Sequence, residues 1–149
     1  MISGTQFMRI ARIVAESSHC VSENVGAVIT KNDRIISCGY NGTPHGYINC
    51  DDIWYGSGPE HSKWSSGHEI HAEMNAIIYA AKAGLSIEGA VLYTTLSPCR
   101  QCLKHMKQSG IKHIYFEELY RKTSPEQHIK DLNFCNDIGI GMTQFSTKS

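Results

Sequence analysis

The sequence predicts an α/β protein, a three-layer α/β/α sandwich built on a mixed five-stranded sheet. Two observations lead to this expectation. Near the N-terminus, two β-rich runs are separated by three polar residues, which predicts a hairpin. Farther along the chain, short apolar runs alternate with segments whose apolar residues recur at helical spacing. A hairpin followed by alternating strands and helices is typical of this layered arrangement.

The first elements are a helix and the hairpin. Apolar side chains recur at helical spacing over residues 5–18, which predicts an amphipathic helix that Thr5 caps and that packs on the sheet. Residues 25–30 and 34–40 are rich in β-branched and apolar side chains, and the polar residues 31–33 join them. We expect these two strands to pair in an antiparallel manner.

Periodicity is lost over residues 42–67. This stretch holds five glycines and two prolines, and its large side chains include Trp54 and Trp64. A segment of this length without regular structure is usually functional. We therefore expect a long loop here with a role in the site.

Helices and strands alternate in the rest of the chain. Small apolar residues at helical spacing predict a helix over residues 69–83, which Gly84 ends. Pro98 is typical of a first helical residue and predicts a helix that continues to Ser109. The other expected elements are strands over 90–95, 112–116 and 140–145 and a helix over 125–138.

Composition limits the classes of function. At 149 residues the chain is expected to form a single domain over residues 1–149. Lys and Arg together number 14, as do Asp and Glu, so the basic excess typical of nucleic-acid binding is absent. No apolar run approaches the roughly 20 residues of a membrane helix, and residues 1–6 lack the blocks of a signal peptide. We expect no nucleic-acid partner, no membrane partner and a cytoplasmic location.

Six cysteines in a reducing compartment favour metal ligands or buried thiols over disulfides. Cys38 and Cys135 lie in apolar strand and helix patterns, so we expect both to be buried as small apolar side chains. The other four are candidates for metal binding.

Two short motifs predict a catalytic zinc site. His71 and Glu73 form His-x-Glu, and Cys99 and Cys102 form Pro-Cys-x-x-Cys some two dozen residues later. Catalytic zinc takes three protein ligands and leaves a fourth position for water, and His71, Cys99 and Cys102 provide that set. The two cysteines share one face of the first turn of a helix, whose dipole favours thiolates. This pair of motifs is typical of zinc-dependent nucleobase deaminases.

Glu73 follows His71 by two residues and is therefore expected beside the zinc-activated water, not on the metal. We expect Glu73 to transfer protons from that water to the ring nitrogen and to the departing ammonia. Backbone groups near Ala72 and Ser97 are expected to hold the base. Two alternatives for Cys-x-x-Cys are a structural zinc site and a redox pair, but neither has a use for Glu73.

Five segments carry a resemblance to a known family: residues 25–29, 39–44, 61–66, 69–76 and 95–99. They resemble the deoxycytidylate (dCMP) deaminases of tailed phages, within the cytidine deaminase-like superfamily. The His-x-Glu and Pro-Cys-x-x-Cys motifs define only the superfamily. The segment Gly39-Tyr40-Asn41-Gly42 distinguishes the resemblance from nucleoside and tRNA deaminases.

The resemblance implies hydrolysis of dCMP to dUMP for dTMP synthesis, in a homohexamer that dCTP activates and dTTP inhibits, with Mg as a possible companion of the nucleotide effector. By position it implies that Asn41 and Tyr120 contact the substrate and that Gly39, Tyr40, Asn41 and Gly42 contribute to an effector site. The alternatives are that Asn41 forms an ordinary turn, because Asn-Gly is a strong turn former, and that Tyr120 is a packing aromatic. If the protein is phage-encoded, its location would be the host cytoplasm.

The resemblance also implies a second, structural zinc, with four ligands: Cys20, Cys50, His61 and Glu69. This set would link the long loop and the end of the first helix to the start of the catalytic helix. Competing ligands are His19, His45 and His68. Free thiols at Cys20 and Cys50 are the other alternative.

Two further functions stay open from the sequence. One is a deaminase that acts on a base in tRNA or single-stranded DNA, which the balanced charge disfavours. The other is a non-catalytic zinc module that senses dCTP, which would not need Glu73. Lys and Arg are scattered along the chain without a cluster, so the sequence does not indicate which residues hold a phosphate.

Overall fold

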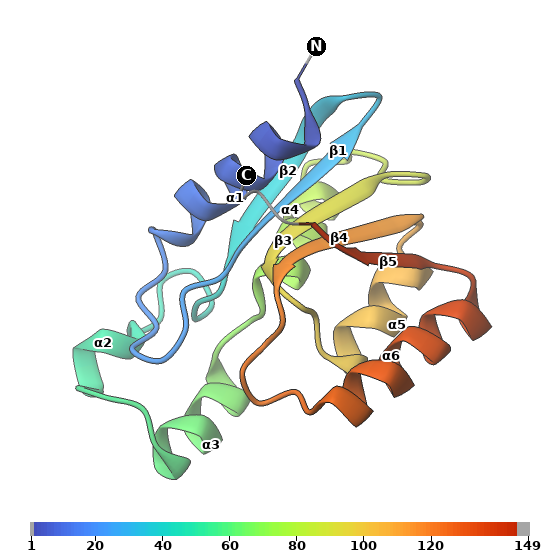
Figure 1. Ribbon diagram of the computed structural model, residues 1–149. Coiled ribbons are helices and arrows are strands. Elements are labelled where there is room, and N and C mark those ends of the chain that lie inside the picture. The colour runs from blue at the N-terminus through green and yellow to red at the C-terminus, as the bar shows by residue number, and fades with distance from the viewer. Residues whose placement is uncertain (1, 146–149) are drawn as a thin grey trace.

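A mixed five-stranded sheet forms the centre of the computed structural model, which describes residues 2–145 (Figure 1). The strand order is β2-β1-β3-β4-β5. β1 pairs antiparallel with β2 and with β3, whereas β3, β4 and β5 are parallel. The strands are β1 (Gly26–Lys31), β2 (Arg34–Tyr40), β3 (Val91–Leu96), β4 (His113–Glu118) and β5 (Gly141–Gln144).

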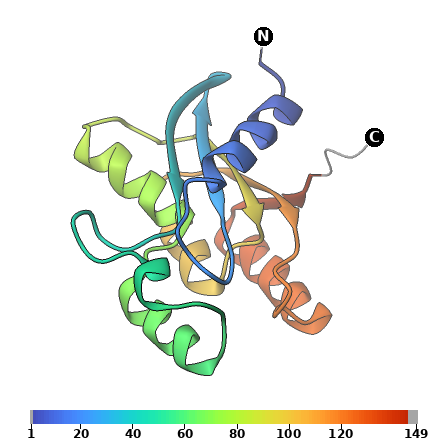
Figure 2. The same cartoon turned by 90° about the vertical axis from the view of Figure 1, so that its left-hand side faces the viewer.

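Helices cover both faces of the sheet, so the predicted three-layer sandwich is confirmed (Figures 1 and 2). One face carries α1 (Gly4–Ala15), whose Phe7, Met8 and Ala11 pack against Val28 and Tyr93. The opposite face carries α4 (Ala72–Lys82), α5 (Arg100–Gln108) and α6 (Pro125–Ile138). Among the described residues, no helix combines the length and apolarity needed to span a bilayer.

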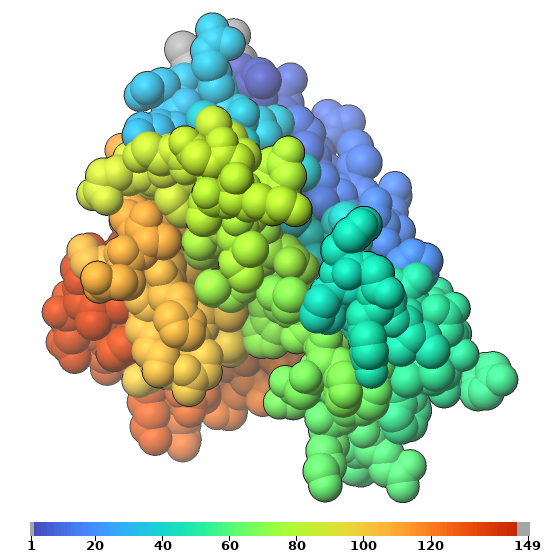
Figure 3. Space-filling view, turned by 180° about the vertical axis from the view of Figure 1, so that it is seen from behind, coloured from blue at the N-terminus to red at the C-terminus, as the bar shows by residue number. Residues whose placement is uncertain are grey.

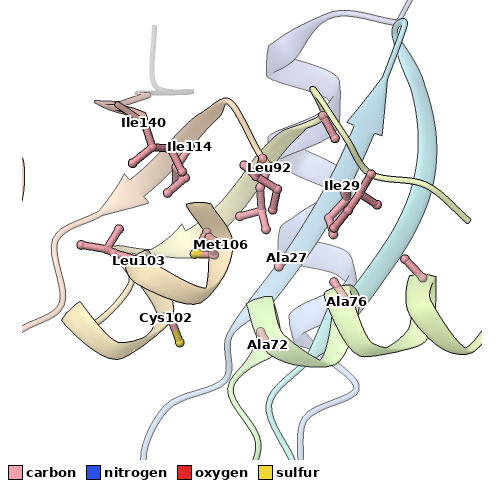
Figure 4. Close-up of a cluster of buried hydrophobic side chains, with 14 of the residues drawn as sticks. Ala27, Ile29, Ala72, Ala76, Leu92, Cys102, Leu103, Met106, Ile114 and Ile140 are labelled. Atoms are coloured by element: carbon pink, nitrogen blue, oxygen red, sulfur yellow. The ribbon is translucent and has the colours of Figure 1, made fainter. Parts of the chain in front are cut away.

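Alternation along β1 divides its side chains between the two layers. Val28 points to α1, whereas Ala27 and Ile29 join the larger apolar cluster with α4 and α5. Figure 4 shows this cluster between the sheet and the two helices. The inward face of α4 consists of the small residues Ala72, Ala76 and Ala80, so the helix lies close to the sheet.

The elements that agree with the prediction have clear signals in the nearby sequence. The hairpin turns at Asn32 and Asp33, which both have positive φ, as in the two-residue turns that suit a twisted hairpin. α6 has the predicted bounds because the Ser124 side chain caps its start and Gly139, with φ of 80°, ends it. Cys135 is buried as expected.

The expected long loop was wrong, because residues 42–67 contain α2 (Cys50–Ile53) and most of α3 (Pro59–His68). α3 is polar and buries only His61 among its residues, so no apolar period marks it in the sequence. Pro59 at its start was its available signal.

Three helix starts and one cysteine also differ from expectation. α1 begins at Gly4 and ends at Ala15, and its cap is Ser3 and not Thr5, because the Ser3 side chain accepts a hydrogen bond from the Gln6 N–H. α4 begins at Ala72 because Ile70 pairs with Gly42 in an isolated β-bridge, which keeps the preceding residues extended. Cys99 caps α5, so Pro98 precedes that helix. Cys38 is exposed and not buried. It pairs with the buried Val28 of β1, but its own strand β2 is at the edge of the sheet, where side chains are less covered.

Gly39 determines how closely β2 approaches α4. A Cβ atom at this position would lie 2.6 Å from both the Ala72 carbonyl oxygen and the Ala76 nitrogen, which are backbone atoms. We expect Gly39→Ala to lower stability by about 1–3 kcal/mol, because the helix must move away from the sheet. Thermal unfolding checks this, with a midpoint expected to fall by several degrees.

Gly42→Ala is the matched control, because a Cβ at Gly42 meets nothing within 4 Å. Its free energy of unfolding should stay within about 1 kcal/mol of the parent. Equal midpoints for the two variants would contradict the role given to Gly39.

Candidate active site

The first turns of α4 and α5 meet at the end of the sheet where β3 and β4 finish (Figure 1). His71 is the N-cap of α4 and Cys99 is the N-cap of α5, both with extended backbone. Nδ1 of His71 lies 3.2 Å from Sγ of Cys102 and 3.6 Å from Sγ of Cys99. The three ligand atoms all lie within 4.8 Å of one another, so the three predicted zinc ligands come together.

This donor set fits a catalytic zinc ion, because one imidazole nitrogen and two sulfurs leave a fourth position for water. A hydrogen bond from Cys102 and another from His71 lower the pKa of the Cys99 thiol to about 4. Conversely, the contact with the Cys99 thiolate raises the pKa of His71 to about 8 and that of Cys102 as well. The lowered pKa of Cys99 favours its thiolate, which is the form that binds zinc.

Glu73 lies in the first turn of α4 and is only 4% exposed. Burial raises the pKa of its carboxyl, and the neighbouring His71 lowers it by a smaller amount. The Thr94 hydroxyl lies 3.0 Å from Oε1 of Glu73 and 3.0 Å from the Leu96 carbonyl oxygen, and can donate its proton to either. Thr94 therefore fixes the carboxyl. No sequence signal marks this contact, because Thr94 is an ordinary β-branched strand residue.

A cavity of about 610 Å³ opens over these groups, a volume typical of small-molecule sites. Its lining includes His71, Glu73 and Cys99 together with four residues expected to contact the substrate: Asn41, Ala72, Ser97 and Tyr120. The structure thus brings all four to one cavity. α3 forms part of another wall, and in Figure 3 α2 and α3 form a lobe beside α4.

Asn41 connects two chain segments at the wall of the cavity. Its Oδ1 accepts a hydrogen bond from the Val25 N–H at 2.9 Å, and its Nδ2 donates to the Glu23 carbonyl at 2.8 Å. The residue therefore links the end of β2 to the segment before β1. One N–H and one lone pair of the amide remain for a ligand.

Tyr120 and Ser97 are also linked. The Tyr120 backbone N–H donates to the Ser97 hydroxyl at 2.9 Å, which holds the loop between β4 and α6 against the segment that leads to Cys99. Ala72 is the first residue of α4, and its methyl group is buried against the sheet. A substrate could therefore contact only its backbone groups.

The expected effector residues are spread over the end of β2. Gly39 is packed under α4, and the Tyr40 carbonyl accepts a hydrogen bond from Asn75 at 2.8 Å. Gly42 pairs with Ile70 through two backbone hydrogen bonds. Of the four, Asn41 is the one in the described lining of the cavity. Their effector role stays a prediction.

A second group of potential ligands comes together beside the cavity: Cys20, Cys50, His61 and Glu69. Nε2 of His61 lies 3.2 Å from Sγ of Cys50, 4.0 Å from Sγ of Cys20 and 3.9 Å from Oε1 of Glu69. Burial raises the pKa of the Cys20 thiol to about 11 and also raises that of Cys50.

The Glu69 carboxylate supports a cation at this second cluster. Its side chain is 3% exposed, and neither carboxylate oxygen has a hydrogen-bond partner within the described part of the chain. An unpaired buried carboxylate is costly, and a bound metal ion would offset that cost. The four donors fit a closed tetrahedral site.

The competing histidines lie elsewhere. His19 pairs with Asp51 at 2.9 Å on the surface, and His45 is exposed. His68 stacks on Trp64 and Tyr47, and its Nδ1 contacts the Trp64 carbonyl. Among the described residues, His61 is the histidine that this cluster contains.

Comparison with known proteins agrees with this geometry. The family model for the cytidine and deoxycytidylate deaminase zinc-binding region matches residues 1–118. The deoxycytidylate deaminases of Enterobacteria phages T2 and T4 are each 45% identical over 152 aligned positions, covering 79% of this chain and 81% and 79% of theirs. A crystal structure of dCMP deaminase from cyanophage S-TIM5 in complex with dCMP and dUMP is 30% identical, with a TM-score of 0.77, covering 97% of this chain and all of that one. The chain belongs to the cytidine and deoxycytidylate deaminase family.

Proposed function

We propose that this protein catalyses the zinc-dependent hydrolysis of dCMP to dUMP and ammonia, which supplies the precursor of dTMP. One observation carries the proposal: the His71, Cys99 and Cys102 cluster and the buried carboxyl of Glu73 face the same cavity. The phage relatives named deoxycytidylate deaminase, and the S-TIM5 structure that contains dCMP and dUMP, favour this substrate over other cytosine compounds.

His71, Cys99 and Cys102 would hold the zinc ion, and zinc bound in this way makes hydroxide available near neutral pH. Glu73 removes a proton from the attacking water and delivers it to the ring nitrogen beside the amino-bearing carbon. It then takes the remaining proton from the hydroxyl that was added to this carbon and passes it to the amino group. The carbon–nitrogen bond breaks, ammonia leaves, and the hydroxyl oxygen becomes the carbonyl oxygen of uracil. Thr94 holds the carboxyl in place during these transfers.

The proposal assigns the remaining residues as follows. Asn41 and Tyr120, with backbone groups of Ala72 and Ser97, contact the nucleotide, which their shared cavity supports. The Cys20, Cys50, His61 and Glu69 cluster holds a structural zinc, which is supported by the buried Glu69 carboxylate, whose oxygens have no hydrogen-bond partner in the described part of the chain.

Regulation and assembly complete the proposal. The resemblance to phage dCMP deaminases supports activation by dCTP and inhibition by dTTP through residues 39–42, with Mg accompanying the nucleotide effector. It also supports a homohexamer, in agreement with the exposed apolar side chains of Ile78 and Tyr79 on α4, which an assembly would cover. The phage relatives favour action in the cytoplasm of an infected cell.

The two alternative functions are disfavoured by separate observations. The net charge of zero gives no general attraction to a nucleic-acid backbone, which argues against a base in tRNA or single-stranded DNA. A module that only senses dCTP gains nothing from a buried carboxyl beside a zinc site, and burying that carboxyl costs free energy.

Glu73→Gln should abolish ammonia release from dCMP, with a loss of at least about a hundredfold in kcat, because the amide cannot carry the transferred proton. Zinc content should be unchanged, since Glu73 is not a ligand. Glu16→Gln, at the exposed end of α1, is the control and should keep full activity. Retained turnover in the Glu73 variant would refute the mechanism.

Metal analysis should find two zinc ions per chain. Cys99→Ala should remove one ion together with the activity, and Cys50→Ala should remove the other and lower the unfolding temperature, because metal binding contributes folding free energy. Cys38→Ala, an exposed cysteine outside both clusters, should keep both ions. A single zinc in the parent protein, or two in the Cys50 variant, would exclude the structural site.

Initial rates of dCMP deamination should rise with added dCTP and fall with added dTTP, each in the presence of Mg. Sedimentation of the same samples should give the mass of six chains. If neither nucleotide changes the rate, the regulatory part of the proposal fails while the deaminase activity stands.

A further inference from the structure

Arg100 is the first residue of α5 and stands between two of the proposed zinc ligands, Cys99 and Cys102. The side chain of the N-cap, Cys99, makes no capping hydrogen bond, and the side chain of Arg100 is 41% exposed. A long side chain in such a position has many rotamers and is ordered only when other contacts hold it. The contacts that Arg100 makes with the rest of the chain therefore affect how firmly this turn is held.

The helix α6 supplies two contacts that together fix the guanidinium group of Arg100. Its Nε donates a hydrogen bond to Oδ1 of Asp131 at 3.0 Å, and its central carbon lies 4.3 Å from the centre of the Phe134 ring. Asp131 and Phe134 are three residues apart and so lie on one face of α6. The charge-assisted hydrogen bond fixes the direction of the side chain, and the stacking on the ring fixes its plane.

Asp131 is the better fixed member of this pair. It is only 6% exposed, and Nε2 of Gln127, one turn earlier on α6, donates to the same Oδ1 atom at 2.9 Å. A buried carboxylate is costly unless a positive charge compensates it. Within the described residues, Arg100 is the cation recorded within 4 Å of this carboxylate. The pair therefore differs from an exposed ion pair, which contributes little.

The core in turn holds α6 in place. Cys135 belongs to the larger apolar cluster, and Phe134 and Ile138 pack against it. Figures 1 and 2 show α5 and α6 side by side on the same face of the sheet. The contact between Asp131 and Arg100 thus links the turn that carries Cys99 and Cys102 to a helix that is anchored in the core.

We propose that Asp131 is a positioning residue for the zinc centre, because it holds Arg100 and, through Arg100, the turn that carries Cys99 and Cys102. The inference rests on the proposed zinc site and adds to it a support from α6. Zinc binds thiolates at about 2.3 Å in a tetrahedral arrangement, so a shift of this turn weakens binding. Loss of a residue that orients zinc ligands typically lowers metal affinity by about 10–100-fold.

Asp131→Ala should weaken zinc binding at the catalytic site at least about tenfold, because Arg100 loses its acceptor. Competition with a chelator measures this affinity, and no nucleotide is present, so contacts with a substrate do not contribute. The ion concerned is the one that Cys99→Ala lacks. Asp131→Asn should recover part of the affinity, since its amide oxygen still accepts the hydrogen bond. Asp137→Ala removes an exposed carboxylate from the same helix and should bind zinc as the parent protein does.

The double variant of Arg100→Ala and Asp131→Ala tests whether the two residues act as a unit. Each single variant should lose about the same affinity, and the double variant should lose no more than either one. Additive losses would show that Asp131 does not act through Arg100 and would overturn the proposal.

The second cluster, with Cys20 and Cys50, provides an internal reference, and its zinc affinity should not change in Asp131→Ala. Equal weakening at both clusters would indicate a general loss of stability and exclude the positioning role, as would parental affinity at the catalytic site. If the parent protein does not deaminate dCMP but its catalytic-site affinity depends on Asp131, the proposed function fails and the positioning role stands. If the parent deaminates dCMP and Asp131→Ala binds zinc equally well, the positioning role fails and the function stands.

Discussion

The convergence of two helix N-termini on one point is the constraint on which the rest of the structure depends. His71 and Cys99 are both N-caps, so two of the proposed zinc ligands project from positions where backbone N–H groups and helix dipoles favour negative ligands. β3 leads directly to Cys99, and the bridge between Gly42 and Ile70 keeps the residues before His71 extended. The parallel pairing of β3 and β4 adds the loop with Tyr120 to the same end of the sheet. The strand order thus positions the cluster of His71, Cys99 and Cys102, and the helices cover the apolar faces of the sheet.

The wall formed by α2 and α3 has a different source of stability. Among the described residues, none from these two helices belongs to either apolar cluster of the sandwich. Instead, Cys50 and His61 meet Cys20 and Glu69, and Trp54 packs against His61 and Trp64. A metal ion at this cluster would therefore do more than satisfy a buried carboxylate. It would fix α3, so that the geometry of the substrate cavity depends on a group outside the catalytic centre.

The sequence predicted what depends on local chemistry. The grouping of His71, Cys99 and Cys102, the hairpin and α6 were predictable because each has a nearby signal: a fixed residue spacing, a turn with polar residues, or a capping serine and a terminal glycine. α3 was missed because its stability comes from distant contacts of His61 and not from an apolar period. The start of α4 was shifted for the same reason, since Gly42 is far from Ile70 in sequence. The contact of Arg100 with Asp131 gave no signal at all, because only the fold places α6 beside the first turn of α5.

Glu73 illustrates why such a site differs from the rest of the core. The other inward residues of α4 are alanines that let the helix approach the sheet, and a carboxyl among them costs free energy unless it is compensated. Burial raises its pKa, whereas the positive charge of His71, or of a bound cation, lowers it. Because these effects oppose each other, neither the ionised nor the neutral form of the carboxyl is favoured by both, which suits a group that must accept and release a proton. The hydroxyl of Thr94 can donate to the ionised carboxylate or accept from the neutral acid, so it holds the carboxyl in either state. In the proposed mechanism, the unfavourable burial of Glu73 is thus a consequence of its role as a reversible proton carrier.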